Sequence, residues 1–285
     1  MPQLCHKRFF GLALLAGLVW LFGIGRAAAD AVPKRVVSIN LCADQLLLAL
    51  ADREQIASLS FLVRDRSLSF LADRAADLPV NDGRGEAILF SDADLVLADY
   101  FGDRNRTALL QSQGMEVLSM PPWQSLTQGR EQIRTLARRL GYPERGEALV
   151  ADIDAALART KDIARGHPSI LTFERRGWVP GTHSLFGEIL RRMGFTLHQE
   201  ALGLGEGGVA RLESIVAHPP DYMLMDDDAG QAVDNGSALL IHPALAASVP
   251  QDRRLILPNR LSICGGPSTP EAIDALAREV TTKVR

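Results

Sequence analysis

The sequence is poor in the features that mark several specialised classes of protein. It has three cysteines in 285 residues, its aromatic content is 6%, and its formal net charge is only −3. So few cysteines exclude a dense disulfide scaffold. The lack of a basic excess argues against a nucleic-acid-binding protein. With 47% hydrophobic and 23% charged residues, the chain has the composition of an ordinary globular protein, and its length predicts about two domains.

Long apolar runs are also scarce. The run at 9–24 is shorter than the about 20 residues that span a bilayer. It follows Lys7 and Arg8 and precedes the small alanines at 27–29, which is the order of a secretory signal peptide. We therefore expect residues 1–29 to be a cleaved signal peptide and the mature protein to be periplasmic, with an uncleaved membrane anchor as the alternative.

Strand-like and helix-like segments alternate through the remaining chain. A β-branched strand at 35–39 precedes a buried helical pattern at 44–50. Helix, glycine and strand follow one another at 107–120, and a strand at 169–173 precedes a helix at 184–193. Such alternation predicts an α/β fold with parallel sheets.

The two halves of the chain contain a diverged repeat. At a constant offset of 127 residues, segment 86–99 resembles segment 213–226, each reading as a short helix, a turn and an apolar strand. The matched pairs are Glu86 with Glu213, Ile88 with Ile215, Asp94 with Asp221, Leu97 with Leu224 and Asp99 with Asp226. The alternative explanation is that both segments only share a common helix–turn–strand pattern. We expect two Rossmann-like lobes, at 30–122 and 167–285.

A helical segment at 123–166 separates the two expected lobes. Within it, the apolar stripe from Pro143 to Ala164 predicts one continuous helix about 30 Å long, with Gly166 as its stop. A continuous helix is a stiffer connection than a Gly/Ser-rich linker, so we expect little closure of the lobes upon binding.

Two further absences limit the chemistry of the chain. After the expected signal peptide the first half has no histidine, which argues against a bare transition-metal site shared by both lobes. There is no G-x-S-x-G motif, and the glycines at 203–208 follow no apolar strand that would make them a dinucleotide site. Ser184 beside His183 is expected to be a helix N-cap. A metal-binding protein and a periplasmic enzyme remain the alternatives.

Several motifs resemble one known family by their order and spacing. These are Arg35–Asp44, the paired acidic segments, Gly181–Ser184 before a helix, and Cys264–Pro267. The chain resembles the single-helix-linked periplasmic substrate-binding proteins of ABC importers for cobalamin or iron–siderophore complexes. The resemblance implies a non-enzymatic, monomeric two-lobe clamp without a cofactor of its own. It also implies a cobalamin-like or ferric-chelate ligand in the cleft, and an ABC permease with its ATPase as partners.

The expected ligand site lies beyond the carboxyl ends of the strands, where open parallel sheets bind ligands. Aromatic side chains there would form its walls, and arginines could bind carboxylate or phosphate groups. The candidates are Phe61, Tyr100, Phe101, Trp178, Arg175 and Arg176, with Asn40 and Arg260 added by the resemblance. Burial in the core is the alternative for the aromatic residues, and simple solvation is the alternative for the arginines.

Two residue pairs complete the expectations. Glu86 and Glu213 begin equivalent helices, where a carboxylate is stabilised by the helix dipole. In the resembling family, glutamates at these positions dock on the permease. Cys42 and Cys264 both follow strands and could pair in an oxidising compartment, although sequence alone does not show their separation.

Overall fold

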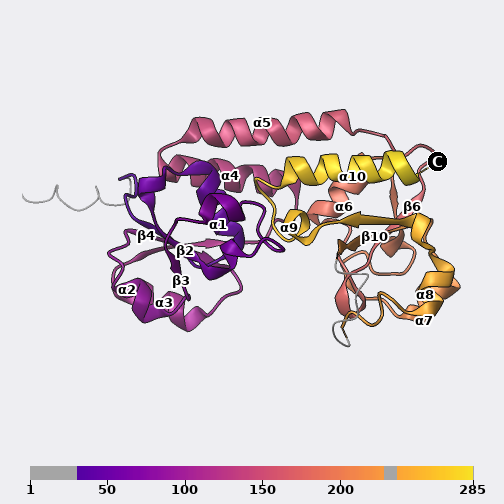
Figure 1. Ribbon diagram of the computed structural model, residues 1–285, viewed down its shortest axis with the longest axis horizontal. Coiled ribbons are helices and arrows are strands. Elements are labelled where there is room, and N and C mark those ends of the chain that lie inside the picture. Colours follow the sequence, from indigo (N-terminus) through magenta and orange to yellow (C-terminus); the bar gives the residue numbers. More distant parts are fainter. Residues whose placement is uncertain (1–30, 228–235, 285) are drawn as a thin grey trace, which may run out of the picture. The chain divides into compact units, whose positions relative to one another are not determined.

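A computed structural model of the protein describes residues 31–227 and 236–284 (Figure 1). The signal peptide expected at 1–29 lies outside the described residues. Within the described ranges, no helix is both long enough and apolar enough to cross a membrane.

The first lobe, called the N-lobe, is a parallel sheet with helices packed against it. Its sheet has the order β3-β2-β1-β4-β5. Its elements are β1 (Val36–Ser38), α1 (Leu41–Leu50), β2 (Ile56–Ser60), β3 (Val80–Asn81), α2 (Gly85–Leu89), β4 (Leu95–Asp99), α3 (Arg104–Ser112) and β5 (Glu116–Met120). The central strands β1 and β4 are almost completely buried, which explains why they read as continuous apolar runs.

The second lobe, called the C-lobe, has a parallel sheet of order β11-β10-β6-β8 and a small antiparallel pair, β7-β9. Its strands are β6 (Ser169–Thr172), β7 (Trp178–Val179), β8 (Thr196–Leu197), β9 (Gly208–Val209), β10 (Tyr222–Asp226) and β11 (Arg254–Leu257). Its helices are α6 (Leu185–Arg192), α7 (Leu212–Ala217), α8 (Pro243–Ser248), α9 (Asn259–Ser262) and α10 (Thr269–Lys283). The expected α/β fold with two parallel-sheet lobes is confirmed.

The internal repeat has a structural counterpart in the two lobes. The carboxylate of Asp94 accepts hydrogen bonds from the backbone N–H groups of Lys34 and Arg35, which lead into β1. The equivalent Asp221 accepts from the N–H of Ser169 at the start of β6. Each aspartate therefore binds the start of the neighbouring strand. Asp94, which precedes β4, holds the start of β1, and Asp221, which precedes β10, holds the start of β6.

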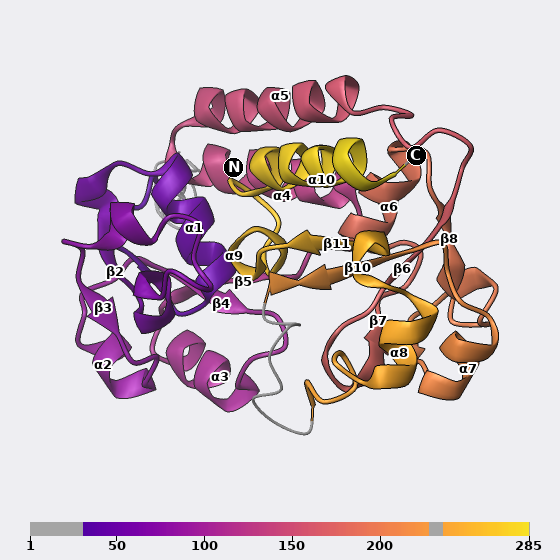
Figure 2. The ribbon, with the colours of Figure 1, turned by 45° about the vertical axis from the view of Figure 1, so that its right-hand side comes forward.

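Two antiparallel helices, α4 (Leu126–Leu140) and α5 (Pro143–Arg159), connect the lobes (Figures 1 and 2). Gly141 ends α4 in the left-handed conformation at φ 88°, and Pro143 occupies the first turn of α5. The prediction of one helix from Pro143 to Ala164 was wrong in its extent. The helix ends at Arg159, and Asp162 at φ 53° cannot continue it.

Helix α5 is tied to both lobes. Near its start, the Arg145 guanidinium pairs with Asp52 at 2.6 Å and donates to the Leu50 carbonyl of the N-lobe. Near its end, Arg159 pairs with Asp274 of α10 at 2.9 Å. One hydrophobic cluster also runs through the N-lobe, both connecting helices and the C-lobe. These contacts support the expectation of a clamp that closes little.

Asp44 of α1 is a fully buried carboxylate beneath the first sheet. One of its oxygens accepts from the Ser60 backbone N–H at 3.0 Å, and the other accepts from the Ser60 hydroxyl. Burial raises the pKa of Asp44 to about 6, while hydrogen bonds from Ser38 and Ser60 lower it. The folded protein therefore holds a proton on this group over a pH range in which the unfolded chain has lost it.

This linkage predicts a measurable pH dependence. Because the folded-state pKa lies above the unfolded value of about 4, stability from Asp44 falls as pH rises from 4 through 6. Asp44→Asn can keep both bonds to Ser60. We expect the free energy of unfolding of this variant, relative to that of the wild type, to rise by on the order of 2 kcal/mol between pH 4.5 and 7.5. Urea unfolding of the variant and the wild type at both pH values measures the difference between their free energies of unfolding. If this difference is the same at both pH values, Asp44 does not titrate in this window.

Candidate ligand-binding site

A cavity of about 390 Å³ opens between the two lobes, within the usual size range of small-molecule sites. Asp99, Met120 and Thr172, which line it, are the last residues of β4, β5 and β6. The cavity thus lies at the carboxyl ends of parallel strands, as expected for an open α/β sheet. The other lining residues include Asn40, Cys42, Phe101, Trp123, Gln132, Glu174, Trp178, Ser184, Phe186, Ser262 and Cys264.

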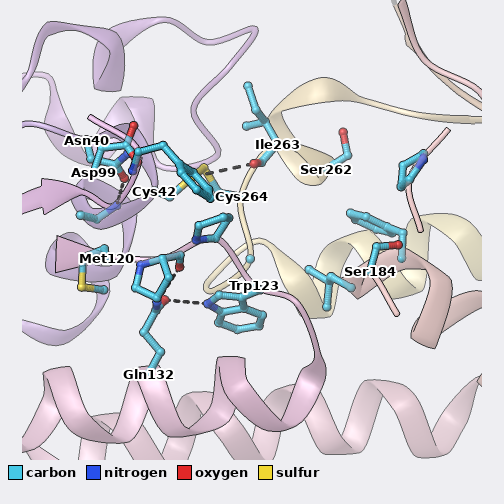
Figure 3. A pocket seen from close by; sticks show the side chains of 18 of the residues that line it. Asn40, Cys42, Asp99, Met120, Trp123, Gln132, Ser184, Ser262, Ile263 and Cys264 are labelled. Carbon is cyan, nitrogen blue, oxygen red and sulfur yellow. Dashed lines mark hydrogen bonds between the residues drawn. A yellow bond between two sulfur atoms is a disulfide. The ribbon is translucent and has the colours of Figure 1, made fainter. Parts of the chain in front are cut away.

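A disulfide between Cys42 and Cys264 forms part of the cavity wall (Figure 3). Cys42 lies in the first turn of α1 in the N-lobe, and Cys264 follows α9 in the C-lobe. Their Cα atoms are 5.2 Å apart, and 222 positions separate them in the sequence. The bond therefore joins the two lobes covalently beside the cavity.

Trp123 forms the floor of the cavity. Its indole N–H donates to the Gln132 side chain at 2.7 Å (Figure 3), and the Gln132 amide donates in turn to the Pro121 carbonyl. Gly129 of α4 and Gly265 of the C-lobe both press against the ring, since a Cβ atom at either glycine would lie 2.3 Å from it. Only glycine fits at these two positions, so the backbone itself holds the ring in place.

Trp178 forms a wall that belongs to the C-lobe. It follows a tight turn in which Arg176 at φ 59° and Gly177 at φ 75° are left-handed, and it pairs with Val209 in the small antiparallel sheet. Its side chain is 46% exposed, although it lines the cavity. Such a ring offers a flat apolar surface to a ligand without supporting the core.

We expect Trp178→Ala to weaken ligand binding by about 1 to 3 kcal/mol and to leave the melting temperature nearly unchanged. The reason is that the exposed ring loses contact with the ligand rather than with the protein interior. Calorimetric titration and thermal melting of the same preparation measure both effects. A large loss of melting temperature with unchanged affinity per folded molecule would identify Trp178 as a structural residue.

The structure brings three of the eight expected ligand-site residues to the cavity lining: Asn40, Phe101 and Trp178. Asn40 acts first as the N-cap of α1, since its side chain accepts from the Ala43 N–H at 2.9 Å. The other five, Phe61, Tyr100, Arg175, Arg176 and Arg260, are exposed and lie outside the described lining. Core burial, the alternative for Phe61 and Phe101, does not hold, because they are 59% and 75% exposed.

Sequence reasoning missed Trp123, Gln132 and Phe186 as lining residues. Trp123 carried a usable signal, because Pro121-Pro122-Trp123 directly follows the expected strand at 115–120. The prediction for Ser184 was confirmed: its hydroxyl caps α6 by accepting from the Gly187 N–H at 3.2 Å.

The cavity is acidic as well as aromatic. Asp99 and Glu174 are the charged side chains among its described lining residues. Removal of water from Glu174 and, secondly, the negative charge of Asp226 raise the pKa of the Glu174 carboxyl. In the ranges 31–227 and 236–284, no three His, Cys, Asp or Glu side chains are grouped as metal ligands would be.

Glu86 and Glu213 occupy the first turns of α2 and α7 and are both exposed. Figures 1 and 2 show α2 and α7 on the side of the molecule away from α5. The two helices that carry these exposed glutamates, one from each lobe, therefore lie on that side.

The family described as "Periplasmic binding protein" matches residues 36–250, well over half of the chain. The chain belongs to this family. No curated protein sequence matches it. The family assignment agrees with the observed two-lobe fold and with a cavity between the lobes. Proteins of this family are solute-binding components that work with an ABC permease and ATPase.

Solved structures of other periplasmic binding proteins share the fold. The apo heme-binding protein RhuT from Roseiflexus sp. RS-1 has 25% sequence identity and a TM-score of 0.72, covering 88% of this chain and 99% of that one. A periplasmic heme-binding protein from Pseudomonas aeruginosa has 19% identity and a TM-score of 0.67, covering 88% and 93%. BhuT, solved with two hemes, has 21% identity and a TM-score of 0.69, covering 88% and 99%.

Proposed function

We propose that this binding protein captures a bulky metal chelate, cobalamin-like or ferric, in the cavity between its lobes and delivers it to the permease of an ABC importer. The observation that carries the proposal is the aromatic lining contributed by both lobes: Phe101 from the N-lobe and Trp178 and Phe186 from the C-lobe. A metal already held by its own chelator needs apolar walls and a few polar contacts rather than protein ligands. The similarity to RhuT, a periplasmic heme-binding protein, also supports a bulky metal chelate as the ligand.

The connecting helices support the same proposal. A preformed cleft loses little free energy to domain closure, so burial of an apolar ring, at roughly 25 cal/mol per Å², contributes more fully to affinity. The ties of α5 to Asp52 and Asp274 and the disulfide between the lobes keep the cleft preformed.

The test is direct because these chelates absorb visible light. The purified protein is incubated with cyanocobalamin, hemin or ferric siderophores and passed through a gel-filtration column. We expect one coloured chelate to elute with the protein in a stoichiometric amount, with a shifted visible spectrum. Elution of colourless protein in every case would overturn the proposal.

We further propose that Glu86 and Glu213 dock the loaded protein on the permease. Paired carboxylates on two similar lobes match a transporter with two similar halves, each of which could offer arginines for charge-assisted hydrogen bonds. Stabilisation of a helix first turn, worth about 0.3 to 1 kcal/mol, is the simpler role for each glutamate.

We expect the double variant Glu86→Ala with Glu213→Ala to keep ligand affinity within about threefold of wild type while uptake through the reconstituted cognate transporter falls steeply. Charge-paired docking governs encounter and register more than ligand binding. Uptake into proteoliposomes at several salt concentrations measures the effect, with the exposed Asp152 of α5 changed to alanine as a control. Normal uptake by the double variant would leave only the helix-dipole role.

A further inference from the structure

The charged side chains that line the cavity have the same sign and come from different lobes. Asp99 ends β4 in the N-lobe, and Glu174 begins the turn after β6 in the C-lobe. No lysine, arginine or histidine is among the described lining residues. A ligand in the cavity would therefore meet two carboxylates, with no opposing cation among these described lining residues.

Neither carboxylate forms an ion pair with a described residue. Asp99 is half-buried, and one of its oxygens accepts from the Phe101 backbone N–H at 3.2 Å. In the part of the chain that the structure describes, no ion pair involves Asp99 or Glu174. The nearby charge of Asp226 disfavours ionisation of Glu174 further, as its raised pKa indicates. Acceptor positions on both side chains thus remain for a ligand.

The aromatic surfaces do not discriminate between chelates by charge. Phe101, Trp123 and Trp178 offer flat apolar faces, which suit any large ring or ligand backbone. Discrimination must come from the polar groups, because a like charge opposite a carboxylate is unfavourable whereas an N–H donor there forms a charge-assisted hydrogen bond.

We propose that Asp99 and Glu174 select the ligand by charge, admitting chelates whose periphery carries amide or ammonium donors and rejecting those that carry free carboxylates or anionic catecholates. This inference rests on the proposed function of the same cavity. Heme, with two free carboxylates, belongs to the rejected class, and the amide-bearing corrinoids belong to the admitted one.

Two pairs of probes test this selection, each pair matched in its metal and differing in peripheral charge. Dicyanocobinamide carries amides where dicyanocobyrinic acid carries carboxylates on the same corrin ring. Ferrioxamine B is a cationic ferric chelate with an ammonium group, whereas ferric enterobactin is a trianion. Equilibrium dialysis of the full chain with each probe gives the dissociation constants. In any pair that binds, we expect the donor-bearing member to bind at least about tenfold more tightly.

The variant Asp99→Asn with Glu174→Gln removes both charges and keeps the shape of the cavity. We expect it to reduce the preference within a pair to about threefold or less, by weakening the donor-bearing probe and strengthening the anionic one. Asp152→Asn, an exposed change on α5 outside the cavity, should keep the wild-type preference. Thermal melting confirms that both variants are folded before binding is compared.

The outcomes separate the two claims. If none of the four probes binds and neither cyanocobalamin nor hemin binds, the proposed chelate-binding function is overturned, and the charge selection with it. If hemin is the only chelate that binds, only the charge selection is overturned. If a probe binds but the anionic member is preferred, or if the preference is the same in the double variant, only the charge selection is overturned.

Discussion

Replacing Cys42 and Cys264 together by alanine is expected to lower the free energy of unfolding by about 3 to 5 kcal/mol. The bond closes a loop of 222 residues, and loop-closure entropy of the unfolded chain grows with the length of the loop. Few single bonds in a protein constrain so much of its chain. Urea unfolding of the wild type and the variant, both without reductant, measures the difference.

The matched control is the wild-type protein unfolded in the presence of a strong thiol reductant. It should unfold at nearly the same urea concentration as the double alanine variant, and reductant should not affect the variant. If the wild type has the same midpoint with and without reductant, while mass measurement shows the thiols to be free in the reduced sample, the disulfide does not stabilise the fold.

Trp123→Ala is expected to cost about 3 to 5 kcal/mol of stability and to abolish measurable ligand binding. The ring is 9% exposed and is packed between the backbone at Gly129 and Gly265, so its removal leaves a void that this backbone cannot readily fill. The floor of the cavity is lost at the same time. Chemical unfolding and calorimetric titration measure the two effects.

Trp178→Ala provides the comparison for this variant, because both tryptophans line the cavity but only Trp123 is buried. Trp123→Phe is a milder variant that retains an aromatic floor and loses the hydrogen bond to Gln132. It should lose about 1 kcal/mol from that bond in addition to its smaller packing loss. Equal stability of Trp123→Ala and wild type would show that the ring is not part of the core.

Local patterns in the sequence were sufficient to predict most elements of the fold. The strand at 35–39 and the helix at 44–50 correspond to β1 and α1, because a continuous apolar run marks the buried strand and the capping side chain of Asn40 begins the helix. The helix beginning at Pro143 was predicted too long because Ile163 and Ala164 continue its apolar stripe. Both residues do pack against the core, but they reach it from a turn.

The cavity was harder to predict, because it depends on contacts between distant segments. The position of Trp123 is determined by Gly129, six residues away, and by Gly265, which lies in the other lobe. No local pattern connects these residues. Ligands of open parallel sheets bind beyond the carboxyl ends of the strands, and this principle correctly suggested Phe101 and Trp178. It also suggested Phe61 and Tyr100, which do not line the cavity, because it identifies an edge of the sheet and not the direction of a side chain.

The sequence separation of the two cysteines also limits how early the disulfide can form. During synthesis Cys42 leaves the ribosome 222 residues ahead of Cys264. Cys42 of the N-lobe therefore remains an unpaired thiol while the connecting helices and nearly all of the C-lobe are synthesised. Formation of this disulfide is thus a late step of maturation, and a chain truncated before Cys264 would keep an unpaired Cys42 beside the cavity.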